Sequence, residues 1–175
     1  MKALMTVHLP ALLPTAGAAL LSLSLWTPAH AAPALCDAPQ GRVVLRVPSA
    51  PGCDLQGLER LPAKEIVTAL PPALGMPGEH RWRGVPLRHI VERLGGGEGS
   101  PIRLTALNDY TIQIPWSDLV RYDPVLAYQR DGQDIGIRDK GPLILIYPFA
   151  AHAPLRQSQE YVNRTIWQVH AVSVR

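Results

Sequence analysis

The sequence lacks several features that mark common classes of function. Lysine and arginine total 17 against 14 aspartates and glutamates, and the two signs are interspersed along the 175 residues. No basic stripe is present, which argues against nucleic-acid binding. After residue 31, no segment is apolar enough to span a bilayer. Nucleic-acid binding and a transmembrane segment beyond residue 31 are therefore set aside.

No catalytic or metal-binding pattern is recognisable either. Ser117 and Asp118 are neighbours, but no Gly-x-Ser-x-Gly elbow surrounds the serine. The aspartates within residues 131–139 do not have the spacing of an EF-hand calcium loop. The histidines after residue 31 also lack metal-ligand spacing. They are His80, His89, His152 and His170.

The first 31 residues have the features of a secretory signal. Lys2 gives a weakly positive start, residues 11–26 are mostly apolar, and Ala29-His30-Ala31 supplies the small residues of a cleavage site. A membrane anchor is the alternative, but Pro14 interrupts a run that is already short for spanning. We expect cleavage after Ala31, export to the periplasm, and a single domain over residues 32–175.

Cysteine is scarce, with only Cys36 and Cys53. Both lie in the part that is expected to be exported, and an even count in an oxidising compartment favours a disulfide. A reactive or metal-binding thiol is the alternative, but no Cys-x-x-Cys or close histidine partner is present. We expect a Cys36–Cys53 disulfide, which would stabilise the fold by about 3 kcal/mol in the loop-entropy model.

The hydrophobic pattern predicts mostly short strands with few helices, as in an α+β or mostly-β domain. Its clearest parts are a hairpin over residues 102–114, with Tyr110, Ile112 and Ile114 alternating, and a fully buried strand over residues 143–147. Other strands are expected at 40–47, 65–70, 125–128 and 166–174, with a helix as the alternative for 65–70. Helical segments are expected at 55–61, 87–94 and 116–120, the last with Ser117 as its cap.

One set of side chains combines aromatic rings, amides, carboxylates and fixed cations in segments beside the predicted strands. Such a combination suits a planar, hydrogen-bonding heterocycle such as a pterin. Core packing is the alternative for the tryptophan of this set, and plain turn chemistry is the alternative for its Asn-Asp pair. The set consists of Trp82, Arg83, Asn108, Asp109, Tyr110, Arg138, Asp139 and Lys140.

Four motifs occur in a fixed order that resembles the sulfite-oxidase-type molybdopterin-binding fold. They are Arg-Trp-Arg-Gly-Val-Pro-Leu at 81–87, Ala-Leu-Asn-Asp-Tyr at 106–110, Leu-Ala-Tyr-Gln-Arg-Asp-Gly at 126–132 and Asp-Lys-Gly-Pro-Leu at 139–143. The resemblance extends over residues 55–174. It implies an α+β domain, with a mixed curved β-sheet and short helices, that holds a pterin in a cleft.

The chain departs from the catalytic members of that family at one position. Those members ligate molybdenum through a cysteine just after the strand that precedes the Trp-x-Gly-Val-x-Leu motif, and residues 66–75 contain no cysteine. A soft thiolate is the ligand that such a metal prefers. We therefore expect a non-catalytic pterin-binding protein without molybdenum, and a molybdenum-cofactor-dependent oxidoreductase is the alternative.

Small periplasmic relatives that lack this cysteine resemble the chain in size and in the motifs at 106–110 and 139–143. The resemblance implies binding of a reduced pterin, of the monapterin or biopterin type. It also implies a partner, the periplasmic domain of an inner-membrane signalling protein. That partner would be a regulator of cyclic di-GMP, and hence of biofilm formation, or a sensor kinase.

Overall fold

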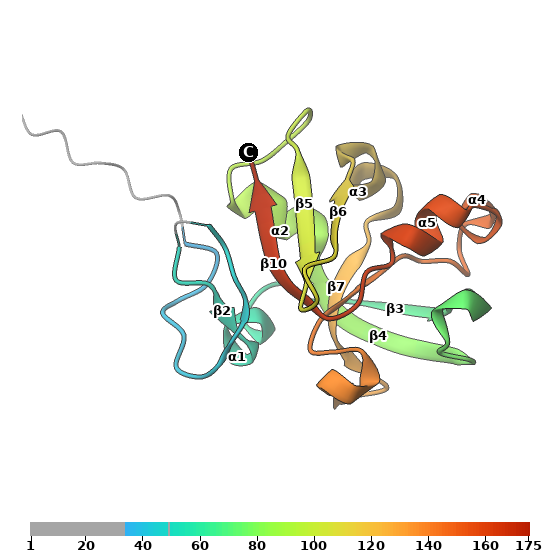
Figure 1. Ribbon diagram of the computed structural model, residues 1–175, viewed down its shortest axis with the longest axis horizontal. Coiled ribbons are helices and arrows are strands. Elements are labelled where there is room, and N and C mark those ends of the chain that lie inside the picture. Colours follow the sequence, from blue (N-terminus) through green and yellow to red (C-terminus); the bar gives the residue numbers. More distant parts are fainter. Residues whose placement is uncertain (1–33, 49) are drawn as a thin grey trace, which may run out of the picture. The chain divides into compact units, whose positions relative to one another are not determined.

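A five-stranded antiparallel sheet contains the buried strand that the sequence predicted. The computed structural model describes residues 34–48 and 50–175, and Figure 1 shows the course of the chain. The strands of this sheet are β3 (Lys64–Ala69), β4 (Glu79–Pro86), β7 (Val125–Arg130) and β8 (Gln133–Asp134), in that order, with β9 (Ile144–Ile146) also paired to β7.

Strand β4, which the sequence analysis did not predict, lies inside this sheet between β3 and β7. Gly84 and Pro86 are residues that normally weaken or interrupt a strand. Here Gly84 follows a register shift, and a Cβ atom at this position would lie only 2.2 Å from the carbonyl oxygen of Leu126. The close approach of β4 and β7 therefore requires glycine.

The predicted hairpin is confirmed and belongs to a second, three-stranded antiparallel sheet. Its order is β10 (Val169–Val174), β5 (Ile102–Ala106) and β6 (Thr111–Ile114). A short β1–β2 pair (Val43–Leu45 with Cys53–Asp54) precedes it in the chain. Directly after β1, Arg46 bridges to Ala171 of β10, so the N-terminal strands are joined to the second sheet.

Short helices connect the strands, and two of them were not predicted. The helices are α1 (Leu55–Glu59), α2 (Leu87–Arg93), α3 (Trp116–Tyr122), α4 (Ala153–Gln157) and α5 (Gln159–Arg164), with 3-10 turns η1 (Pro72–Leu74) and η2 (Ile137–Asp139). The pair α4 and α5 is new. The expected Ser117 cap is wrong, because Pro115 holds the N-cap position of α3 without a side-chain bond. None of the helices in the described residues is both long enough and apolar enough to cross a membrane.

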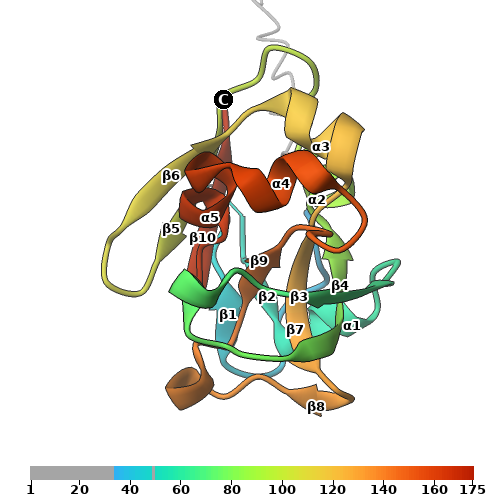
Figure 2. The same cartoon turned by 90° about the vertical axis from the view of Figure 1, so that its right-hand side faces the viewer.

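The apolar faces of both sheets form one core. Leu104 of β5, Leu126 of β7 and Leu145 of β9 are all at most 1% exposed. These residues come from the runs that the sequence marked as strands, and the short helices lie around the sheets (Figures 1 and 2). The α+β prediction is therefore confirmed.

The expected disulfide is also confirmed. Cys36 and Cys53 are bonded, with 5.5 Å between their Cα atoms, and both are buried. The bond ties the segment before β1 to the start of β2. The predicted signal at 1–31 lies outside the described residues, and the described residues form one compact unit.

Candidate functional site

A cavity of about 400 Å³ opens beside the β5–β6 turn. It has three neutral amide side chains in its lining, and we call it the amide cavity. Its walls come from three parts of the chain: η1, the β5–β6 turn, and the segment from α5 to the start of β10. The lining residues are Ala73, Leu74, Ala106, Asn108, Tyr110, Gln159, Val162, Asn163, Thr165, Ile166 and Trp167.

The β5–β6 turn brings Asn108 and Tyr110 to this cavity. Asp109 adopts a left-handed conformation with φ of 63°, and its backbone N–H donates to the carbonyl of Ala106 at 2.9 Å. The Asn108 side-chain oxygen accepts from the Tyr110 backbone N–H at 3.2 Å. Asparagine and aspartate favour such turns because their short side chains can bond the nearby backbone. The turn leaves the Tyr110 side chain half exposed at the cavity.

Helix α5 presents different side chains on its two faces. Gln159, Val162 and Asn163 line the amide cavity, and their i, i+3, i+4 spacing places them on one face. The Gln159 amide donates to the Asn163 side-chain oxygen at 3.0 Å. Glu160 and Arg164 are spaced i, i+4 on another face, where they form an ion pair. The helix can therefore be anchored on one side while it lines the cavity with the other.

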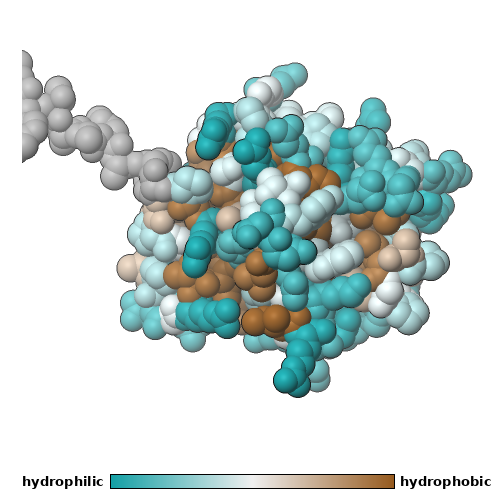
Figure 3. Space-filling view, viewed as in Figure 1, coloured by the Kyte–Doolittle hydropathy of each residue, from teal (hydrophilic) through white to brown (hydrophobic). Residues whose placement is uncertain are grey.

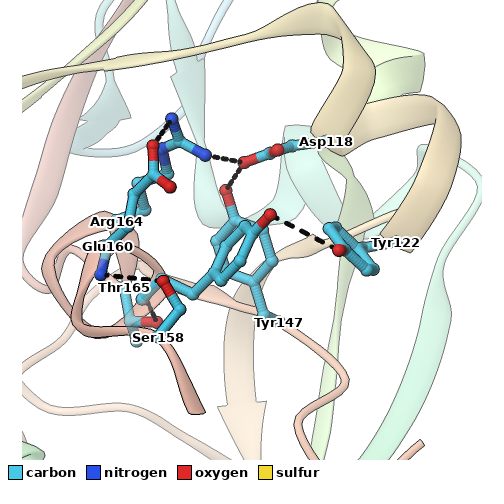
Figure 4. Close-up of polar contacts among 8 residues, drawn as sticks. Asp118, Tyr122, Tyr147, Ser158, Glu160, Arg164 and Thr165 are labelled. Carbon is cyan, nitrogen blue, oxygen red and sulfur yellow. Dashed lines mark hydrogen bonds and ion pairs between the residues drawn. The ribbon is translucent and has the colours of Figure 1, made fainter. Parts of the chain in front are cut away.

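A buried polar network supplies that anchor (Figure 4). Arg164 donates to the Asp118 carboxylate of α3 at 2.9 Å, and the Tyr147 hydroxyl donates to the same oxygen at 2.8 Å. The Asp118 side chain is 5% exposed and that of Arg164 is 17% exposed. Because a buried carboxylate needs compensating partners, these contacts fix α5 against α3 and the strand end at Tyr147.

Burial controls ionisation in this network. It raises the pKa of Asp118 above its ordinary value, and the Tyr147 hydrogen bond and the Arg164 charge oppose that rise. Burial, and next the neighbouring Asp118 charge, raise the pKa of Tyr147 well above its ordinary value. The hydrogen bond to Tyr122, followed by burial, raises the pKa of Tyr161 to about 12. The Tyr147 and Tyr161 hydroxyls are therefore protonated at neutral pH and hold their positions as hydrogen-bonding groups.

Lys140 joins η2 to the rim of the amide cavity. Its ammonium group lies 4.4 Å from the centroid of the Trp167 ring and donates to the carbonyl of Leu74 in η1. A cation over an indole face is a favourable electrostatic contact. The Trp167 side chain remains 37% exposed and lines the cavity. Lys140 thus holds two walls of the cavity together.

The structure brings together only part of the predicted set. Asn108 and Tyr110 line the amide cavity, and Lys140 contacts two of its walls. The prediction that Trp82 offers an aromatic face is wrong, because its side chain is fully buried and its indole N–H donates to the Thr68 carbonyl at 3.3 Å.

The other four residues are outside the lining of this cavity. Arg83 is on β4, where it donates to the Tyr128 hydroxyl at 3.4 Å and lies 4.0 Å from Glu65. Asp109, at the tip of the hairpin, is exposed, as are Arg138 and Asp139 in η2. These four residues are therefore not part of the amide cavity, and their contact with a pterin stays a prediction.

Sequence reasoning missed Trp167 and the amides of α5. Trp167 was assigned to an alternating strand, although Ile166 and Trp167 are adjacent apolar residues that cannot both face the core of a strand. Ile166 is buried and Trp167 is exposed. That break in alternation was the available signal. For Gln159 and Asn163, the six-residue helix has too few apolar positions to reveal a face.

Comparison with models of protein families shows to which family this chain belongs. Residues 52–153 match the model of the oxidoreductase molybdopterin binding domain. The chain belongs to this family. The segment from η1 to β4 of this family member supplies Ala73 and Leu74 to the amide cavity. That is the stretch whose counterpart in catalytic relatives was expected to carry the metal-ligating cysteine.

A solved structure supports the same fold. The sulfane dehydrogenase SoxCD from Paracoccus pantotrophus is similar with a TM-score of 0.50 and 14% sequence identity, over 69% of this chain and 33% of that chain. The family member described here therefore spans about a third of the dehydrogenase chain, and at this identity the likeness concerns the fold alone. The comparison with curated proteins finds no match.

The amide cavity fits the pterin part of the cofactor that the family name implies. Amide groups both donate and accept hydrogen bonds, as the edge of a pterin requires, and Tyr110 and Trp167 offer ring faces. The fit to molybdenum is poorer, because Cys36 and Cys53 are both engaged in the disulfide and neither lines the cavity. Across residues 34–48 and 50–175, no group of three or more His, Cys, Asp or Glu side chains is placed to hold a metal ion.

Proposed function

We propose that this protein binds a pterin in the amide cavity and does so without a thiolate-held molybdenum ion. The observation that carries the proposal is the lining itself. It combines two exposed aromatic rings with three neutral amides, and it includes no cysteine and no carboxylate. Membership in the molybdopterin-binding family supports a pterin-type ligand.

The neutral lining favours recognition by amides over recognition by a carboxylate. Beyond the bonds already described, Asn108, Gln159 and Asn163 retain donor and acceptor capacity that can meet the pyrimidine edge of a pterin. Tyr110 and Trp167 are available to stack on the ring plane. Lys140, at the rim, is a cation that can meet a ring carbonyl or a polar tail.

A reduced monapterin or biopterin titration tests the site directly. Trp167→Ala should weaken binding by about 5- to 150-fold, because stacking of a base on an aromatic ring contributes roughly 1–3 kcal/mol. Asn108→Ala should weaken binding by about tenfold through the loss of one amide contact. Affinity would be measured by calorimetric titration of protein whose folding is checked by circular dichroism.

Asp139→Ala is the matched control. Asp139 is an exposed turn residue outside the lining, so its replacement should leave affinity close to that of the wild type. Equal affinity in wild type and Trp167→Ala would contradict this placement of the ligand, and no binding of any pterin by the wild type would contradict the function. Stoichiometric molybdenum in periplasmically expressed protein would favour the oxidoreductase alternative.

We further propose that the protein acts in the periplasm as a relay. A non-catalytic binder needs a receiver to affect the cell, and the motifs at 106–110 and 139–143 resemble those of periplasmic pterin-binding signalling proteins. The receiver would be the periplasmic domain of an inner-membrane regulator of cyclic di-GMP or of a sensor kinase. The ligand state would then control that partner.

Deletion of the gene is expected to change cellular cyclic di-GMP and biofilm formation, and the Trp167→Ala protein should fail to restore them. Both quantities are compared between the deletion strain, the strain complemented with wild type, and the strain complemented with Asp139→Ala. Affinity purification from membranes should recover a protein with a periplasmic domain. Unchanged cyclic di-GMP and biofilm, with no co-purifying membrane protein, would rule out the relay.

A further inference from the structure

A second cavity, of about 470 Å³, lies where β1 and η2 meet the start of β10. Its lining combines apolar side chains with two arginines and a histidine, and we call it the arginine cavity. The volume is within the range of small-molecule sites, which are typically apolar with a few polar groups. The lining residues are Arg42, Val43, Val44, Arg46, Leu107, Ile135, Gly136, Ile137, Pro142 and His170.

Both arginines of this cavity carry uncompensated charge. Neither Arg42 nor Arg46 forms an ion pair or a side-chain hydrogen bond with any of the described residues, and both are exposed. They lie on either side of Val44 at alternate positions, while Leu45 and Val47 are buried in the core. Both arginines line the cavity together with Val43 and Val44, so the two guanidinium-bearing side chains stand at the ends of a short apolar stretch.

His170 is held at this cavity by an irregularity in β10. The pairing of β10 with β5 shifts between Val169 and Ala171, and His170 is the residue left over. Such bulges redirect a side chain and are frequent near functional sites. The His170 carbonyl accepts from the Arg46 backbone N–H at 2.7 Å, which fixes β1 beside it. The ring nitrogen Nδ1 is shielded from solvent and has no hydrogen-bond partner within the described residues.

The rim of the cavity is apolar and partly exposed. Leu107 is 42% exposed and Ile137 is 44% exposed, and both belong to the lining. Figure 3 shows brown apolar patches among hydrophilic side chains on the part of the surface where, in Figure 1, the N-terminal strands approach the start of β10. A ligand that fills this cavity would cover apolar side chains and meet guanidinium groups at the same time.

We propose that the arginine cavity is a binding site for a small organic anion with an apolar body and a carboxylate group. A guanidinium presents a planar fork of donors that matches a carboxylate, and charge-assisted bonds of this kind are stronger than neutral ones. The apolar body would lie against Val44, Leu107 and Ile137. The site is distinct from the amide cavity, with which it shares no lining residue.

Hexanoate is a suitable probe, and 1-hexanol is its uncharged counterpart of the same chain length. Each would be titrated into the full chain while backbone and His170 side-chain signals are followed by nitrogen-15 NMR. Hexanoate should shift the signals of Val44, Leu107, Ile137 and His170, and 1-hexanol should bind about tenfold more weakly. Arg46→Gln should weaken hexanoate binding by about tenfold, as should Arg42→Gln.

Arg103→Gln is the matched control, since Arg103 is an exposed arginine of β5 outside both cavities. It should leave hexanoate affinity unchanged. Equal binding of hexanoate and 1-hexanol, shifts that do not include the lining residues, or wild-type affinity in both Arg42→Gln and Arg46→Gln would overturn the proposal. Pterin binding is measured on the same samples, so failure at this site is distinguishable from failure at the amide cavity.

Discussion

Trp82→Ala is expected to lower the free energy of unfolding by about 3–5 kcal/mol, the range for removal of a buried tryptophan. The side chain is fully buried in the central strand β4, and its indole N–H donates to the Thr68 carbonyl. Truncation would leave a cavity and an unpaired carbonyl in the core. Urea denaturation followed by circular dichroism measures the change.

Tyr110→Ala is the control for this substitution, because Tyr110 is an aromatic residue that is 50% exposed. Its replacement should change the free energy of unfolding by less than about 1 kcal/mol. Trp82→Phe keeps most of the buried volume and should bind pterin as the wild type does. A Trp82→Ala protein that is as stable as the wild type but has lost pterin affinity would indicate that Trp82 contacts the ligand. That result would contradict the packing described above.

Asp118→Ala is expected to lower the free energy of unfolding by about 3 kcal/mol, the lower end of the range for breaking a buried ion pair. The lower end applies because Arg164 retains its contact with Glu160. The Tyr147 hydroxyl would also lose its acceptor. Since Arg164 anchors α5, the substitution should weaken pterin binding as well, even though Asp118 does not line the amide cavity.

Glu160→Ala removes the other carboxylate that contacts Arg164 and is the matched control. The Glu160 side chain is 59% exposed, so this pair should contribute less than about 1 kcal/mol. Denaturation in urea and titration with reduced pterin would be performed on both variants. Equal losses of stability in the two would contradict the claim that the Asp118 contact is the anchor of α5.

The pH dependence of Asp118→Asn tests the electrostatics of the same network. Because burial raises the folded-state pKa of Asp118, the pH-dependent part of its contribution to stability is fully present below the ordinary value of 3.8 and is lost as pH rises through the raised value. Asparagine does not titrate, so the stability deficit of the variant should be largest near the ordinary value and should shrink as pH rises. A deficit that grows with pH would mean that the Arg164 charge outweighs burial.

The elements that were predicted correctly are those with strong local signals. The hairpin of β5 and β6 has alternation and an Asn-Asp turn, and β9 lies in a continuous apolar run. Strand β4 gave no such signal, because it contains a glycine and ends on a proline, and the need for Gly84 arises only from the close pairing with β7. The short helices α4 and α5 are stabilised by tertiary contacts, which a local pattern does not contain.

The candidate site could be predicted only where it coincides with a turn. Asn108 and Tyr110 are placed at the amide cavity by local backbone geometry, which the sequence indicates. Trp82 was assigned to the ligand as an aromatic face for stacking, yet alternation along β4 buries the tryptophan and exposes Arg81 and Arg83. The contribution of α5 depends on the distant residues Asp118 and Tyr147, so no local pattern could reveal it.

At the β5–β6 turn, one stretch of backbone forms part of the wall of both cavities. Ala106 and Asn108 line the amide cavity while Leu107, between them, lines the arginine cavity. The Leu107 N–H donates to the carbonyl of Gln168, whose side-chain amide donates to Ile137. Occupants on opposite sides of this wall would be thermodynamically linked if the binding of one displaces the wall. If a ligand in one cavity changes the affinity of the other cavity by some factor, the second ligand changes the affinity for the first by the same factor. A shift of the wall would thus make an anion an effector of pterin binding, and pterin an effector of anion binding.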